Sequence, residues 1–183
     1  MKEYITNAIV LGRRPYRERD WVVDLFAESF GPIAARVVGG MRVRSKFSPH
    51  LDVGNLVLVR LVKTNRFTVA DVATTDRFPA LRADPAILGR VLELLALVRR
   101  LAPPHVADPH LWHHLTESFG RSTASVVETL ALLGHDPRGA RCGRCGASPV
   151  AQFVFPDHLV CCDACARPFP PSERVCISGY EWG

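Results

Sequence analysis

Two pairs of cysteines are the residues in this sequence whose spacing most directly predicts chemistry. Cys142 and Cys145 form one Cys-x-x-Cys pair, and Cys162 and Cys165 form a second pair after 16 intervening residues. This spacing is typical of a zinc site with four thiolate ligands. Four thiolates complete the tetrahedral shell of zinc and leave no open position for a substrate or a catalytic water. The motif therefore predicts a structural zinc ion rather than a catalytic centre.

Two further cysteines are less well defined. Cys161 could replace Cys162 as a ligand, although three residues rather than two would then precede Cys165. Cys176 lies outside the pairs, and we expect it to be a small buried hydrophobic residue. The N-terminus lacks the pattern of a signal peptide, so we expect a cytoplasmic protein with reduced thiols. A disulfide framework is the alternative interpretation of the six cysteines.

Positive charge is concentrated in the first third of the chain. Residues 1–66 contain 12 Lys and Arg and 6 Asp and Glu, a net charge of +6, whereas the whole chain of 183 residues carries +5. Nine of these 12 bases are arginines, which suit bidentate phosphate contacts and base stacking, although a basic segment can also be a solvated face. The candidate DNA-binding residues are Arg13, Arg14, Arg17, Arg36, Arg42, Arg44, Lys46, Phe47 and Arg66.

The strongest of these candidates lie in one short segment. Arg42, Arg44 and Lys46 alternate with other residues, so an extended loop would point all three bases to one side. Phe47 offers a stacking surface for a base or, alternatively, an anchor in the core. Arg36 lies within an apolar run, where it could contact phosphate or pair with Asp24.

The elements that would position these bases are strands. Short β-branched runs bounded by turn residues predict five of them, at residues 4–11, 21–27, 33–38, 56–62 and 67–72. Five short strands are typical of an OB-type barrel, which commonly binds single-stranded nucleic acid. We expect the first strand to end before a basic turn that carries Arg13, Arg14 and Arg17.

The segment after the strands is helical in pattern. Asp84-Pro85 and Asp108-Pro109 are typical helix starts, and a third apolar stripe near 123–133 ends at Gly134. His110, His113 and His114 lack the HExxH pattern of a metal site, so we expect them to be exposed. Beyond this segment, residues 152–155 and 158–161 predict a hairpin between the two cysteine pairs.

These patterns predict an α+β chain with three parts. A five-stranded OB-fold nucleic-acid-binding domain occupies residues 1–80, and a small α-helical domain occupies 81–140 and is continued by 171–183. An inserted, zinc-ribbon-like module with four cysteines occupies 141–170.

Four stretches of the chain resemble RecO, a family of bacterial DNA repair and recombination mediators. They are Ala8–Asp20, Phe30–Ile33, the "Gly-x-x-Arg…Ser" loop at Gly39–Phe47, and Val127–Pro137 running into the first cysteine pair. The order and spacing of these stretches match the family. Its helical region is longer than the one between Asp84 and Arg141, so the chain resembles a short or truncated member.

The resemblance implies a non-enzymatic role in DNA repair and homologous recombination, in the RecF pathway at the bacterial nucleoid. The family binds single- and double-stranded DNA, anneals complementary strands and assists recombinase loading onto DNA coated by single-strand-binding protein (SSB). The implied partners are RecR and the acidic C-terminal tail of SSB, which docks in the helical domain of this family.

Two other classes of function are alternatives to this role. A zinc-ribbon, OB-fold protein that binds RNA or acts in translation is the main alternative, because OB barrels also bind RNA. A zinc deaminase would need an HxE and a PCxxC motif, and nucleotide hydrolysis would need a Walker A sequence. None of these three motifs occurs in the sequence, so an enzyme is not expected.

Overall fold

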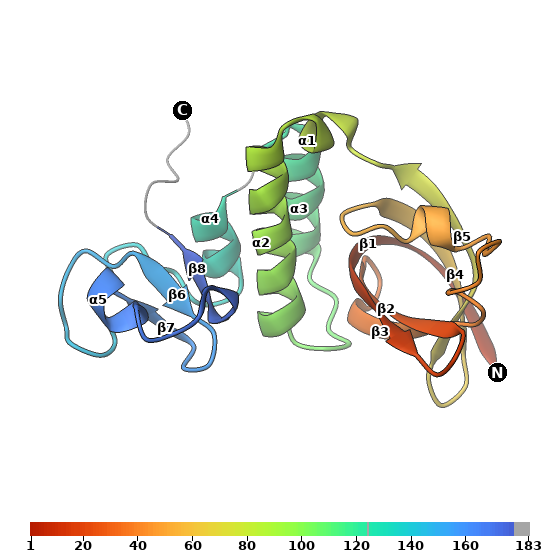
Figure 1. The fold of residues 1–183 in the computed structure, drawn as a ribbon, viewed down its shortest axis with the longest axis horizontal. Coiled ribbons are helices and arrows are strands. Elements are labelled where there is room, and N and C mark those ends of the chain that lie inside the picture. Colours follow the sequence, from red (N-terminus) through yellow and green to blue (C-terminus); the bar gives the residue numbers. More distant parts are fainter. Residues whose placement is uncertain (124, 178–183) are drawn as a thin grey trace.

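A computed structural model describes residues 1–123 and 125–177 of the chain. Three parts lie in a row: a β-barrel, a group of helices and a small module built on a second sheet (Figure 1). The barrel strands are β1 (Lys2–Tyr16), β2 (Asp20–Ala27), β3 (Gly31–Val37), β4 (Leu56–Lys63) and β5 (Phe67–Asp76). The α+β class is therefore confirmed.

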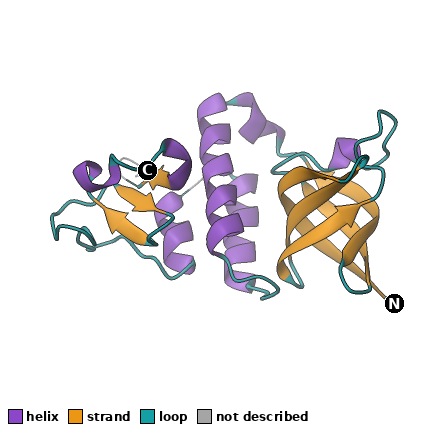
Figure 2. Cartoon of the chain, turned by 60° about the horizontal axis from the view of Figure 1, so that its bottom comes forward, coloured by secondary structure: helices purple, strands orange, loops and turns teal. Residues whose placement is uncertain are grey.

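The five strands close into a barrel (Figure 2), and their order around it is β1-β2-β3-β5-β4. Its neighbouring strands are antiparallel except for β3 and β5, which pair in parallel. A short 3-10 helix, η1 (Ser48–His50), lies in the connection between β3 and β4. This arrangement confirms the predicted five-stranded OB barrel.

The middle of strand β1, residues 8–12, is buried on both faces, which explains the apolar run there. Ala8 and Val10 point into the barrel, whereas Ile9 and Leu11 pack outward against the helices. Successive side chains of a strand point to opposite faces, so a strand between two cores has no polar face.

The predicted end of the first strand was wrong. Strand β1 continues through Gly12 to Tyr16, because this segment pairs with Asp20–Asp24 of β2 beyond a register shift at Val10/Gly12. Arg13 and Arg14 therefore lie in a strand rather than in a turn. The turn itself is Arg17–Arg19, and Arg17 adopts a left-handed conformation with φ of 55°.

The helices are α1 (Pro79–Ala83), α2 (Pro85–Leu101), α3 (Pro109–Gly120) and α4 (Val126–Leu132). The predicted caps are confirmed: the Asp84 carboxylate accepts from the backbone N–H groups of Ala86 and Ile87, and that of Asp108 accepts from Leu111. The third predicted helix starts later, at Val126, because Ser125 caps it. Within the described residues, every helix is too short or too polar to span a membrane.

One hydrophobic core connects all three parts of the molecule. It runs from Phe26 on the outside of the barrel, through Leu94 and Leu115 of the helices, to Phe153 and Val175 of the small module. A second core fills the barrel. Since close-packed cores resist deformation, the helices brace the barrel and the module against each other.

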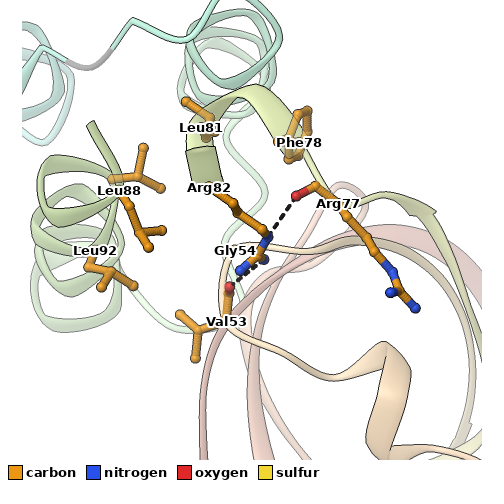
Figure 3. Close-up of a pocket in the computed structure, with 9 residues that line it drawn as sticks. Val53, Gly54, Arg77, Phe78, Leu81, Arg82, Leu88 and Leu92 are labelled. Carbon is orange, nitrogen blue, oxygen red and sulfur yellow. Dashed lines mark hydrogen bonds between the residues drawn. The ribbon is translucent and has the colours of Figure 1, made fainter. Parts of the chain in front are cut away.

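The junction between barrel and helices is locked by Arg82 (Figure 3). Its guanidinium donates to the carbonyl oxygens of Arg77 and Val53 and to the side-chain oxygen of Asn55, at 2.8–2.9 Å. The cavity beside it, of about 10 Å³, is no larger than one water molecule. The contacts of Arg82 therefore hold the barrel and the helices together, and the cavity is too small for a ligand.

The small module contains β6 (Gln152–Val154), β7 (Leu159–Cys161), α5 (Asp163–Ala166), η2 (Pro171–Glu173) and β8 (Arg174–Cys176). The predicted hairpin is confirmed as β6 and β7. We expected residues 171–183 to continue the helical domain, but 171–176 form a 3-10 helix and a strand that pairs with β6. Residues 178–183 lie outside the described part of the chain.

Candidate metal centre and nucleic-acid interface

The four paired cysteines converge at one end of the module. The sulfur atoms of Cys142, Cys145, Cys162 and Cys165 all lie within 4.8 Å of one another. The Cys145 and Cys162 sulfurs are 3.7 Å apart. Zinc–sulfur bonds of about 2.3 Å in a tetrahedron place sulfurs about 3.8 Å apart, so the cluster fits a zinc ion.

Backbone N–H groups prepare this cluster for a cation. The N–H groups of Cys162, Arg144 and Cys145 point at the Cys142 sulfur and lower the pKa of that thiol to about 5. Hydrogen bonds with the thiols of Cys145 and Cys162 instead raise the pKa of Cys165 to about 12. A metal that binds here must therefore displace protons from the cluster.

The two remaining cysteines lie outside the cluster. Cys161 is fully buried in the small core of the module, where burial raises the pKa of its thiol. Cys162, and not Cys161, thus belongs to the four-sulfur set. Cys176 is half-buried in β8, so the prediction of a buried position was wrong: Val175 takes the buried face of this strand, and the next residue points to the opposite face.

Three arginines, Arg141, Arg144 and Arg167, lie next to the paired cysteines in the sequence, where they could offset the net negative charge of a zinc–tetrathiolate. The Arg144 guanidinium already lies 2.6 Å from the Asp157 carboxylate and stacks on the Phe169 ring. Arg141 donates to the Gly146 carbonyl oxygen, and Arg167 is exposed. The charge of Arg144 is therefore shared with Asp157.

At one end of the barrel, the β1–β2 turn and the β4–β5 turn lie in contact. Arg66, in the β4–β5 turn, donates to the Tyr16 hydroxyl beside the β1–β2 turn at 3.1 Å. The Arg17 guanidinium lies 5.3 Å from the centre of the Tyr16 ring. The hydrogen bond from Arg66 and the nearby Arg17 lower the pKa of Tyr16. These two turns are the loops with which OB folds commonly bind oligonucleotides.

A third segment, residues 38–47, is held against the same end of the barrel; we call it the basic loop. The Asp20 carboxylate accepts from the backbone N–H of Gly39 at 2.8 Å and from the Arg36 guanidinium. The Met41 N–H donates to the Arg19 carbonyl oxygen. The Gly39 N–H and, next, Arg36 lower the pKa of Asp20. Asp20 therefore ties the basic loop to the β1–β2 turn.

The cations of the basic loop are accessible. Arg42 and Arg44 are exposed and form no ion pair with any described residue. Lys46 lies 3.2 Å from Asp71, but both side chains are more than half exposed. Phe47 is half-buried against the barrel core, which favours an anchoring role over base stacking.

Three other predicted residues are held by the protein itself. Arg13 stacks 4.3 Å above the Trp21 ring and pairs with Asp52, and Arg14 pairs with Asp24. The sequence suggested Asp24 as a partner for Arg36, but Arg36 pairs with Asp20. The Asp24 carboxylate instead accepts from Arg14 and from Arg99 of α2.

Sequence reasoning missed Tyr16, Arg19 and Arg99. Tyr16 and Arg19 flank the predicted Arg17, so their position in the same basic turn was an available signal. Arg99 had none, because its partner Asp24 lies 75 positions earlier in the chain.

The histidines line a groove between α3 and α4. His110 and His113 are exposed as expected, but His114 is mostly buried and lies 3.1 Å from the Thr129 hydroxyl. Burial lowers the pKa of His114. Among the described residues, these side chains do not converge on a common point as the cysteines do.

Comparisons with known proteins agree with this geometry. The family model described as "Recombination protein O N terminal" matches residues 1–75, the barrel strands. A Geobacter metallireducens protein named DNA repair protein RecO is 30% identical over 183 aligned positions, which cover 91% of this chain and 74% of that protein.

Two further relatives carry the same name. The Myxococcus xanthus protein is 27% identical over 161 positions, covering 81% of this chain and 66% of its own length. The Desulforudis audaxviator protein is 28% identical over 190 positions, covering 97% and 76%. The chain thus spans about two thirds to three quarters of the length of these three relatives.

Proposed function

The chain belongs to the RecO family, and we propose that it is a DNA repair and recombination mediator that binds DNA through the loop-bearing end of its barrel. Single and double strands, RecR and the C-terminal tail of SSB would be its partners, the last two by family membership alone. The relatives' shared name supports the role in DNA repair.

One observation carries the proposal: three separate segments bring cations to the same end of the barrel. Arg17 comes from the β1–β2 turn, Arg66 from the β4–β5 turn, and Arg42 and Arg44 from the basic loop. Cations that neutralise phosphates release condensed counterions, which drives sequence-independent DNA binding.

The same surface can favour annealing. Two complementary strands repel each other through their phosphates, and a cationic surface that holds one strand lowers this repulsion for the second. Association steered in this way is faster, and it weakens with salt. No bond is made or broken in this process, so the proposed role is non-enzymatic.

The metal centre would stabilise the folded structure of the small module. Cys142, Cys145, Cys162 and Cys165 would hold a zinc ion that joins the turn before β6 to the start of α5. A closed shell of four thiolates offers no site for substrate, so the ion would supply structural stability alone.

The test is an annealing assay with complementary oligonucleotides, run with and without strands coated by SSB. The chain should shorten the half-time of pairing, and replacement of Arg42, Arg44 and Lys46 together should remove most of this effect. Pairing no faster than in buffer would refute the proposal. Tighter binding to structured RNA than to single-stranded DNA at equal salt would instead favour an RNA-binding role.

A further inference from the structure

The basic loop exposes apolar side chains close to its cations. Val43 is fully exposed, and Val38 and Met41 are 51% and 43% exposed. Of the ten large hydrophobic residues exposed in the described part of the chain, these three lie within six positions of one another. Scattered exposed apolar residues need no explanation, but such a concentration within one loop does.

This part of the loop has a defined shape. Gly40 packs so closely on Trp21 that a Cβ at this position would lie 3.1 Å from the indole ring. In the residues that follow, the backbone N–H of Arg42 donates to the carbonyl oxygen of Gly39, and the backbone N–H of Ser45 donates to the carbonyl oxygen of Arg42. Val43 therefore lies within the second of two consecutive turns, between Arg42 and Ser45, and its side chain is exposed.

The charges beside Val43 indicate which kind of ligand would contact it. Arg42 and Arg44 flank Val43 directly in the chain, and neither forms an ion pair with a described residue. A cation, an apolar side chain and a second cation in sequence suit a ligand in which anionic groups flank an apolar stack. The bases and phosphates of a nucleic acid have this arrangement.

We propose that Val43 is a wedge that enters between stacked bases of bound DNA while Arg42 and Arg44 hold the neighbouring phosphates. Proteins that bend or open DNA insert apolar side chains between base steps in this way. Within this one loop, Val43 would disrupt the stacking of the bases and the two arginines would bind phosphates. The unstacked bases would then be free to pair with another strand. This inference rests on the proposed DNA-binding function.

The experiment uses the full chain and a forked duplex that carries 2-aminopurine, a base whose fluorescence is quenched by stacking, at the junction. Binding is measured separately by fluorescence anisotropy. The wild-type chain at saturation should raise the 2-aminopurine fluorescence. Val43→Ser should bind the fork within about threefold of the wild type and with the same salt dependence, yet lose at least about half of the fluorescence rise. Val43→Leu should retain it.

Each outcome decides between the proposals. An undiminished fluorescence rise with Val43→Ser, or binding by the wild-type chain with no rise at all, overturns the wedge and leaves DNA binding intact. A wild-type chain that does not bind the fork overturns both proposals. Binding to vesicles of anionic lipid that Val43→Ser abolishes, with no effect of this substitution on the fork, would assign this part of the loop to a lipid surface and overturn the wedge.

Discussion

The Arg99 guanidinium of α2 lies 2.6 Å from the Asp24 carboxylate of β2, and Arg14 of β1 approaches the same carboxylate at 2.7 Å. The Asp24 side chain is only 13% exposed. A single acid therefore joins two barrel strands to the central helix. The next residue, Arg100, stacks on Phe155 of the module and donates to the Ser172 carbonyl oxygen. The end of α2 thus contacts both neighbours.

Replacing Asp24 with Asn should destabilise the protein by about 1–2 kcal/mol, because two adjacent guanidiniums then lose their shared partner. Urea unfolding followed by circular dichroism measures this change. Glu3→Gln is a matched control, since Glu3 and Arg60 are 3.5 Å apart and about half exposed. This control should stay within about 0.5 kcal/mol of the wild type, and equal effects of both substitutions would contradict the assigned role.

Asp20 should make stability depend on pH in the acidic range. Its pKa is lower in the folded chain than the ordinary value of 3.8, so the folded state binds fewer protons than the unfolded state near that pH. The stabilisation is present above the unfolded-state pKa and is lost as pH falls through the folded-state pKa.

Asp20→Asn should accordingly be less stable at pH 7 and show a shallower loss of stability between about pH 5 and 3. Urea midpoints at four pH values in this range measure both effects. Parallel curves for variant and wild type would show that Asp20 is not held by Gly39 and Arg36 in solution.

Tyr16 should titrate below the ordinary tyrosine pKa of 10, because Arg66 and then Arg17 stabilise the phenolate. Arg66→Met should raise the pKa of Tyr16 towards that value. The ultraviolet absorbance difference between this variant and wild type across pH 8–11 isolates the affected tyrosine. Identical titration curves would mean that the two turns do not touch.

The fold followed from the sequence wherever local pattern and local chemistry agree. The helix starts at Asp84 and Asp108 were predictable because the capping carboxylate lies two or three residues from the N–H groups it binds. The four metal-ligand candidates were predictable because each Cys-x-x-Cys pair fixes its own geometry.

Distant partners decided the rest. Strand β1 extends to Tyr16 because β2 pairs with it, and β8 forms because residues 174–176 pair with residues of β6 that lie 20–24 positions earlier. The roles of the arginines likewise depend on acids that the fold brings near. Arg14 and Arg36 resemble Arg42 and Arg44 in the sequence, yet only the first two face a carboxylate.

The assignment of Cys162 over Cys161 predicts distinct metal contents. Wild type and Cys161→Ala should each retain one zinc per chain after exhaustive dialysis, because Cys161 lies in the apolar core and outside the four sulfurs. Cys162→Ala should retain well under one, since three thiolates hold zinc more weakly than four. Elemental analysis of the dialysed proteins measures the ratio. Zinc loss from Cys161→Ala alone would reverse the assignment.

The most direct test of the DNA interface is the salt dependence of single-strand binding. For a fluorescent oligonucleotide, Arg42→Ala with Arg44→Ala should weaken binding and flatten the slope of log Kd against log salt by about 1.4, or roughly 0.7 for each lost phosphate contact. The matched control removes Arg121 and Arg138, two exposed arginines of the helical region that pair with Glu117 and Asp136. Its slope should equal that of the wild type. An unchanged slope for the basic-loop variant, or an equal change in the control, would contradict the account.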